Sequence, residues 1–145
     1  MEPAASLLAF LFVSLVSIES VAPTLQALAR DRAGLLLLVV HGSRARGEAR
    51  VDSDWDFAYL AKAEADIPAL YSELTLALGT DAIDLTDLAN AGGLFRYRTA
   101  RDGIVLFERE PRLFEKFWFD AVSFWCDAAP VLRSGYKSVL DGLGS

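Results

Sequence analysis

The sequence predicts an α/β (α+β) domain in which helices flank a mixed sheet of about four strands. Two observations predict this class. Several segments carry apolar residues at helical spacing, and shorter apolar or alternating runs between them are typical of strands. With 145 residues, 53% of them hydrophobic and 23% charged, the chain can bury the core of one domain. We place that domain at residues 21–145.

The first elements are a helix, a central strand and a short helix. Residues 20–31 read as a helix, with Ser20 as a possible cap and Pro23 in its first turn. The continuous apolar run GLLLLVVHG at residues 34–42 is bounded by glycines and predicts a buried central strand. A short helix should follow over residues 43–49.

Three further elements follow in the middle of the chain. The alternating segment SDWDFAYLA, residues 53–61, predicts a second strand. Residues 66–80 carry apolar residues at helical spacing, and Gly79 is the expected stop of that helix. The segment DAIDLTDL, residues 81–88, predicts a third strand.

The C-terminal third should contain a helix over residues 91–101, a fourth strand over residues 103–108, and helix from Pro111 onward with a break at Pro130. Aromatic residues recur in this last helix at three- and four-residue steps. A helix that covers one sheet face explains them, and the alternative is that Trp118 or Phe119 docks a partner. The aromatic set is Phe114, Phe117, Trp118, Phe119, Phe124 and Trp125.

Charge and cysteine content exclude several functions. The net charge of −6 and the pI of about 4.7 argue against a protein that grips long nucleic acid, although a nucleotide needs only a local basic cluster. The single cysteine, Cys126, excludes an internal disulfide and a multi-cysteine zinc site, and we expect it to pack as a small apolar residue. This cysteine usage suits a reducing cytoplasm.

Residues 1–20 form an apolar N-terminal extension. The run PAASLLAFLFVSLVSI, residues 3–18, resembles the core of a signal peptide, but no Lys or Arg precedes it. It is also shorter than the ~20 apolar residues of a membrane span, so we do not expect a membrane segment. The interpretations, in order, are an extra helix packed on the domain or a partner, a start site assigned too early, and a true membrane or export segment.

The segment GSRARGEARVDSDWD, residues 42–56, carries the chemistry. Gly42 and Ser43 lie where the buried strand ends and a short helix begins, and such a turn presents backbone N–H groups to a phosphate. Arg44 and Arg46 supply local positive charge and are, with Gly42 and Ser43, the candidate nucleotide-binding residues. An ordinary capped turn is the alternative, because serine is a common helix cap.

Acidic residues follow at strand spacing. Asp54 and Asp56 point to the same face of a strand, and such paired carboxylates suit Mg²⁺, although a solvated pair of loop acids is the alternative. Asp84 lies between apolar residues of the third strand, where a carboxylate needs a metal or cationic partner. Asp81 and Asp87 lie nearer the strand ends and should be solvated. If the second and third strands are neighbours, Asp84 completes a three-carboxylate cluster.

Together these features predict nucleotidyl transfer. Ten residues separate Ser43 from Asp54, and an acid follows in the next strand. Metal ions held by such acids stabilise the attacking and leaving oxygens of an in-line displacement, while the turn holds the outer phosphates. His41, the only histidine, excludes a histidine-rich metal site. We interpret it as a structural residue, with a nucleotide contact as the alternative.

These residues carry a family resemblance. The segments HGSRARG, DSDWDFAYL and IDLTDL resemble the signature of the DNA polymerase β-like nucleotidyltransferase superfamily, in its minimal nucleotidyltransferase (MNT) branch. The similarity covers roughly residues 22–140. The segment RTARDGIVLFERE is similar to the branch that acts as antitoxin to HEPN-domain ribonuclease toxins. Two features differ from the family: His41 replaces a frequent aromatic residue, and the apolar extension precedes the usual start.

The resemblance implies an adenylyltransferase that moves AMP from ATP to a tyrosine of a cognate HEPN toxin. It assigns the triphosphate contact to Gly42 and Ser43 and two Mg²⁺ ions to Asp54 and Asp56, with Asp84 as third acid and candidate base. Two alternatives stay open. One is a binding module that neutralises the toxin without catalysis, and the other is nucleotidyl transfer to a small molecule such as an aminoglycoside.

Overall fold

The computed structural model describes residues 16–143, except for the side chains of residues 129, 131–133, 136, 139, 140 and 143. In chain order the elements are α2 (Ile18–Asp31), β1 (Leu35–His41), α3 (Gly42–Ala45), β2 (Trp55–Ala61), α4 (Ile67–Leu78), β3 (Ile83–Asp87), the 3-10 turn η1 (Leu88–Asn90), α5 (Gly93–Asp102), β4 (Ile104–Glu108) and α6 (Leu113–Leu143). Each predicted helix and strand is present, and most bounds differ by a few residues.

The four strands form one mixed sheet in the order β3-β2-β1-β4. Strand β1 is antiparallel to both of its neighbours, whereas β2 and β3 are parallel. Parallel neighbours need a crossover connection, and α4 provides it between β2 and β3. The expected mixed α+β sheet is therefore confirmed, with the continuous apolar run of β1 in an interior position.

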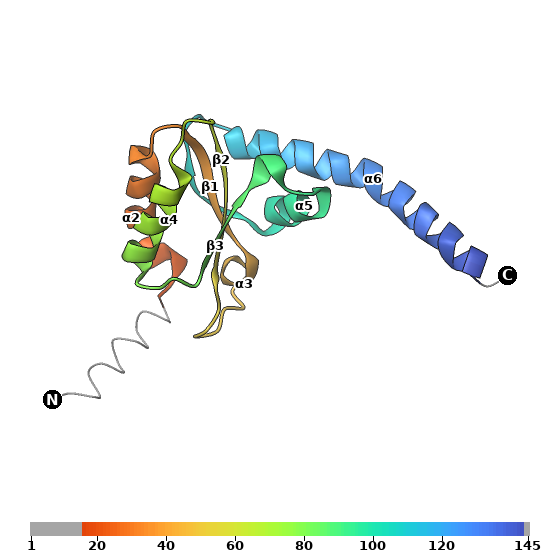
Figure 1. The fold of residues 1–145 in the computed structure, drawn as a ribbon, viewed down its shortest axis with the longest axis horizontal. Coiled ribbons are helices and arrows are strands. Elements are labelled where there is room, and N and C mark those ends of the chain that lie inside the picture. Colours follow the sequence, from red (N-terminus) through yellow and green to blue (C-terminus); the bar gives the residue numbers. More distant parts are fainter. Residues whose placement is uncertain (1–15, 144–145) are drawn as a thin grey trace.

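Helices cover both faces of this sheet. Helices α2 and α4 lie on one face, and α5 with the first part of α6 lies on the other (Figure 1). Strand β1 is buried on both sides, since Leu38 and Val40 belong to the core under α2 and α4, and Leu37 and Val39 to the core under α5 and α6. This two-sided burial explains why its sequence is a continuous apolar run.

Helix α4 shows how local sequence sets an element. Asp66 caps its start, because the Asp66 carboxylate accepts a hydrogen bond of 3.0 Å from the Ala69 N–H. Pro68 occupies the first turn, where its missing N–H costs nothing. Gly79 ends the helix in the left-handed conformation, with φ of +67°, as the sequence predicts.

Helix α2 begins earlier than expected. Ser17, not Ser20, is its cap, and the Ser17 hydroxyl accepts a hydrogen bond of 3.3 Å from the Ser20 N–H. Pro23 therefore lies inside the helix rather than in its first turn. At the other end, Arg109 donates hydrogen bonds to the backbone carbonyls of Ala29, Arg30, Arg32 and Leu35. It thereby satisfies carbonyls that a helix end leaves without partners.

The break expected at Pro130 is wrong, because α6 continues as one helix through that residue to Leu143. A proline in a helix removes one backbone hydrogen bond and pushes against the preceding turn, and a long helix can absorb this by bending. Only the first part of α6 lies on the sheet, and its outer part extends away from the domain body (Figure 1).

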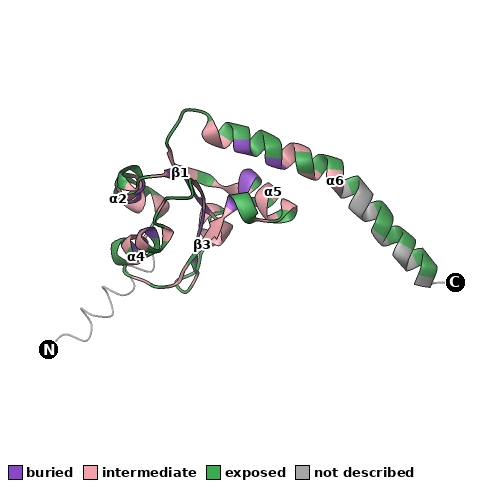
Figure 2. Cartoon of the chain, turned by 45° about the horizontal axis from the view of Figure 1, so that its top comes forward, coloured by how far each residue is buried: buried purple, intermediate pink, exposed green. Residues whose placement is uncertain are grey.

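Burial along α6 follows that geometry. Buried positions on α6 lie in its first part, beside α5 (Figure 2). Phe117 and Ala121 are buried, whereas Phe124 is 61% exposed. Cys126, which we expected to be packed, is exposed. Trp125 stacks on Tyr97 of α5, with ring centroids 5.7 Å apart, so this part of α6 packs on α5 and leaves some apolar positions open to solvent. The aromatic pattern therefore covers a sheet face over only part of its length.

The N-terminal extension is mostly outside the described residues, which begin at Val16. The division into an extension over residues 1–20 and a domain over residues 21–145 stays a prediction. Across residues 16–143, no helix is both long enough and apolar enough to span a bilayer.

Core packing generates a first prediction. Phe57 is fully buried under α2 and α4, whereas Phe119 on α6 is 64% exposed. We expect Phe57→Ala to lower the free energy of unfolding by about 3 to 5 kcal/mol, because it removes buried apolar surface and leaves a cavity. Phe119→Ala, the matched control, should change it by less than about 0.5 kcal/mol. Urea denaturation measures both, and equal losses would contradict the assigned core.

Candidate functional site

The central feature of the site is a row of polar residues across three strands. His41 at the end of β1 pairs with Asp56 of β2, and Asp56 pairs in turn with Asp84 of β3. Alternation along the strands places these side chains on the sheet face that carries Val39 and Ala58, the face of α5 and α6. The second and third strands are thus neighbours, and Asp84 lies beside Asp56 in register.

Asp54 lies immediately before β2, two residues from Asp56, and is exposed. Asp84 is also exposed, because β3 is an edge strand. We expected a carboxylate between Ile83 and Leu85 to need a metal or cationic partner, but solvent reaches Asp84, so its position alone does not require one. Asp87 differs as well: it is half-buried, and its carboxylate accepts hydrogen bonds from the Ala89 N–H and the Asn90 side chain.

The Asp56 side chain lies close against the backbone of Gly42. Gly42 has a φ of +73°, and a Cβ at this position would lie 2.2 Å from Oδ2 of Asp56. Glycine is needed here both for the left-handed backbone and for the close approach of the carboxylate. The turn that begins α3 and the first acid of β2 therefore form one continuous surface.

Helix α3 consists of one turn, Gly42–Ala45. The first four N–H groups of a helix have no hydrogen-bond partner within the helix. Because α3 has only four residues, all of its N–H groups lack a partner within it. The Arg46 N–H closes the turn on the Gly42 carbonyl at 3.2 Å. Gly42 and Ser43 thus offer backbone donors beside the carboxylate row, where the sequence predicts a phosphate.

The electrostatics of the row centre on Asp56. Burial raises the pKa of Asp56, the charges of Asp84 and Asp54 raise it further, and His41 and Arg46 oppose the change. Within the described residues, no three His, Cys, Asp or Glu side chains converge closely enough to hold a metal ion. The carboxylates of Asp54, Asp56 and Asp84 nevertheless suit a divalent cation in their chemistry. Neighbouring carboxylates disfavour each other's charge, and their oxygens are hard ligands for such an ion.

His41 occupies the opposite end of the row. Its ring meets Phe95 of α5 edge-on, with centroids 5.1 Å apart. Burial lowers the pKa of His41, and the charge of Asp56 acts against this shift. Its Nε2 atom is buried and has no hydrogen-bond partner within residues 16–143. The ring is thus packed against Phe95, while its Nε2 atom is open to a further partner, so the structural role of His41 stays a prediction.

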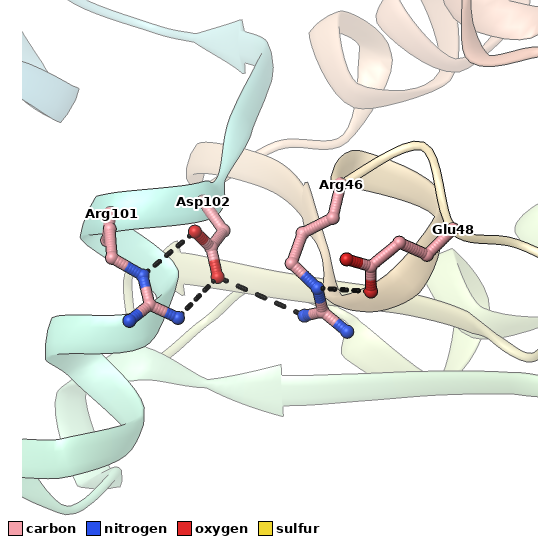
Figure 3. Close-up of polar contacts among 4 residues, drawn as sticks. All are labelled: Arg46, Glu48, Arg101 and Asp102. Atoms are coloured by element: carbon pink, nitrogen blue, oxygen red, sulfur yellow. Dashed lines mark hydrogen bonds and ion pairs between the residues drawn. The ribbon is translucent and has the colours of Figure 1, made fainter.

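The two arginines of the motif point to different partners. Arg44 lies over the Trp55 ring, 4.2 Å from its centroid, and donates a hydrogen bond of 2.7 Å to the Ser53 carbonyl. This engagement ties the α3–β2 loop to the start of β2. Arg46 instead contacts two acids, Glu48 and Asp102 (Figure 3).

Sequence reasoning missed Asp102. It is the last residue of α5, 56 positions beyond Arg46, and its carboxylate looks in the sequence like an ordinary solvated charge at a helix end. No periodicity or spacing signals a contact of this range. Only the placement of β4 beside β1 brings the end of α5 to the motif.

Comparison with known proteins identifies the family. The family model described as "Polymerase beta, Nucleotidyltransferase" matches residues 23–112, which is more than half of the chain and includes every site residue described above. The chain therefore belongs to this nucleotidyltransferase family, and the expected polymerase β-like fold is confirmed.

One relative is similar in sequence and one solved structure is similar in fold. "Protein adenylyltransferase MntA" of Aphanizomenon flos-aquae is 35% identical over 96 residues, which cover 57% of this chain and 63% of the relative. The chain thus spans somewhat under two thirds of that relative's length. A toxin–antitoxin crystal structure with AMP-PNP is 25% identical, with a TM-score of 0.65, over 86% of this chain and 98% of the other.

A further structure shares the fold. It contains a tri-AMPylated Shewanella oneidensis HEPN toxin in complex with an MNT antitoxin, and the match covers 88% of this chain and 98% of the other. The two chains are 24% identical with a TM-score of 0.60.

The contact at Gly42 generates a second prediction. Gly47 has nearly the same φ, +74°, but no described heavy atom lies within 4 Å of a Cβ built there. Both Gly→Ala variants should lose about 1 to 2 kcal/mol of unfolding free energy to the left-handed backbone. Gly42→Ala should lose at least about 1 kcal/mol more, because the new Cβ must displace Asp56.

Urea denaturation of both variants measures this difference, and a crystal structure of Gly42→Ala should show the Asp56 carboxylate moved. Equal losses at the two positions, with Asp56 unmoved, would show that the close approach is not a constraint.

Proposed function

We propose that the protein is a Mg²⁺-dependent adenylyltransferase that transfers AMP from ATP to a tyrosine hydroxyl of a cognate HEPN ribonuclease toxin, and so acts as its antitoxin. The observation that carries this proposal is the junction of turn and acids, in which the Asp56 carboxylate lies against the Gly42 backbone and Asp84 is its neighbour in register. The similarity to MntA and to a toxin–antitoxin bound to AMP-PNP supports the choice of nucleotide and acceptor.

Each residue has a distinct role in this proposal. The backbone N–H groups of Gly42 and Ser43 bind the outer phosphates of ATP, and Arg46 adds positive charge there. Asp54, Asp56 and Asp84 would hold two Mg²⁺ ions. When bound, these ions would supply charge stabilisation for the attacking and leaving oxygens.

Transfer of AMP to the tyrosine forms one bond at the α-phosphorus and breaks another. The tyrosine oxygen attacks the α-phosphorus of ATP and forms a new phosphodiester bond, and the bond between the α-phosphorus and the bridging oxygen breaks. Pyrophosphate leaves with that oxygen. The phenolic proton passes to the carboxylate of Asp84, which is exposed and can accept it.

A second candidate function is a non-catalytic module that blocks the toxin by occlusion. Exposed aromatic residues support it, since Trp118 is 44% and Phe119 64% exposed. A groove of about 660 Å³ between the start of α5 and α6 is lined by Gly92, Gly93, Leu94, Phe95, Phe124, Trp125 and Ala128. These surfaces serve toxin binding in either candidate, so the carboxylates decide between the two. We place the activity in the cytoplasm, where ATP and a ribonuclease toxin occur together.

The deciding experiment incubates the protein with Mg²⁺, ATP labelled at the α-phosphate, and the cognate HEPN toxin, which the family resemblance implies is encoded by a neighbouring gene. Label on a toxin tyrosine would support adenylyl transfer. A stable complex without label would favour the occlusion module and contradict the catalytic proposal.

The carboxylates generate a third prediction. The double variant Asp54→Asn with Asp56→Asn should lower the labelling rate at least about 100-fold, because it removes the charges that would hold the metal ions. The fold should persist, since Asp54 is exposed and both changes keep the side-chain size.

Asp81→Asn is the matched control. Asp81 is an exposed acid just before β3 and is not part of the carboxylate row. Its variant should label the toxin at the normal rate. Unchanged labelling by the double variant would contradict the catalytic role of the aspartates.

A further inference from the structure

Arg46 is held close to the carboxylate row by the backbone. It directly follows α3, and its N–H bonds to the Gly42 carbonyl. Its charge also acts on the row: the pKa of Asp56 is raised chiefly by burial, and Arg46 is among the groups that oppose this rise. The guanidinium therefore lies near the turn of Gly42 and Ser43. The direction in which it points depends on the side chains that bind it.

Two carboxylates hold that guanidinium. Nε of Arg46 donates to Oε2 of Glu48 at 3.0 Å, and Nη1 lies 3.9 Å from Oδ2 of Asp102 (Figure 3). The two acids differ in environment, since the Glu48 side chain is 64% exposed on a loop and that of Asp102 is 16% exposed. Glu48 is thus a solvated partner, whereas Asp102 is a sheltered one.

Asp102 is itself fixed from two directions. Arg101 holds both of its oxygens, with Nε to Oδ1 and Nη2 to Oδ2 each at 2.9 Å. The next residue, Gly103, closes α5 by donating to the Thr99 carbonyl at 2.8 Å, and a Cβ there would lie 2.4 Å from the same oxygen. The end of α5 is thus tightly packed, and the Asp102 carboxylate stands at a fixed place beside the motif.

The arrangement leaves part of the Arg46 guanidinium available. An arginine side chain has five N–H donors in a planar fork, and Glu48 and Asp102 face Nε and Nη1. Among the described residues, no acceptor is paired with Nη2, which has two donors for a ligand. A phosphate oxygen is the partner that this geometry favours, because the guanidinium fork matches phosphate and carries full charge.

We propose that Asp102 is a positioning residue for nucleoside triphosphate binding, holding Arg46 so that its remaining donors face the outer phosphates. This inference rests on the proposed function for the nature of the ligand. The alternative is a surface ion-pair network that contributes little. The low exposure of the Asp102 side chain and the two hydrogen bonds that it accepts from Arg101 favour the positioning role.

The test measures nucleotide binding directly, with the full chain, Mg²⁺ and AMP-PNP in isothermal titration calorimetry. Asp102→Asn keeps the shape of the side chain and removes its charge. We expect its Kd for AMP-PNP to rise about three- to tenfold, because the guanidinium of Arg46 loses the charge that orients it. Glu48→Gln removes the exposed acid from the same arginine and is the matched control, with an expected rise below about twofold.

A double-mutant cycle separates positioning from general destabilisation. In an Arg46→Ala background, Asp102→Asn should raise the Kd by less than about 1.5-fold, because the group that it positions is gone. In the transfer assay, Asp102→Asn should raise the KM for ATP and leave kcat within about twofold. Thermal melting of each variant confirms that it is folded.

Three outcomes would overturn the inference: an unchanged Kd for Asp102→Asn, an equal loss for Glu48→Gln, or the same fold-change of Asp102→Asn with and without Arg46. Wild-type protein that does not bind AMP-PNP would overturn it as well. If the wild type binds AMP-PNP with the expected variant pattern but labels no toxin, the proposed function fails and the positioning role of Asp102 stands.

Discussion

The contact between the Asp56 carboxylate and the Gly42 backbone is the constraint on which the rest of the site depends. The antiparallel register of β1 and β2 pairs His41 with Asp56 and thereby brings the start of β2 onto the turn that ends β1. Any side chain at residue 42 would occupy the space of Oδ2 of Asp56. The turn of Gly42 and Ser43 and the acids Asp54 and Asp56 therefore fold together. The ten residues between Ser43 and Asp54 form the loop that connects the turn to the acids.

The sheet adds the remaining groups from either side of this unit. The crossover through α4 makes β3 parallel to β2 and places Asp84 beside Asp56. On the other side, β4 runs antiparallel to β1, so the end of α5 just before it brings Asp102 toward Arg46. The strand order β3-β2-β1-β4 thus arranges the acids on one flank of the turn and the arginine with its carboxylate partner on the other.

Much of this was accessible from sequence, because local patterns determine local structure. The apolar run of β1 and the stop at Gly79 follow from burial and backbone conformation, and acids at strand spacing indicate a shared face. The pairing of Arg46 with Asp102 was not accessible, since each looks like a solvated charge and only the strand order joins them. The predictions for the start of α2 and for a break in α6 were wrong for a different reason. Ser17 and Ser20 are equally good caps by sequence, and Pro130 is tolerated where α6 extends beyond the sheet.

The exposure of Cys126 has a practical consequence. It is the only cysteine in the chain and lies on α6, next to Trp125, which lines the groove between α5 and α6. A thiol-reactive fluorophore would therefore attach at one defined position on α6. Its emission would respond when another molecule covers this part of α6. The protein thus carries a built-in attachment point for an optical signal of complex formation that is independent of whether any chemistry takes place.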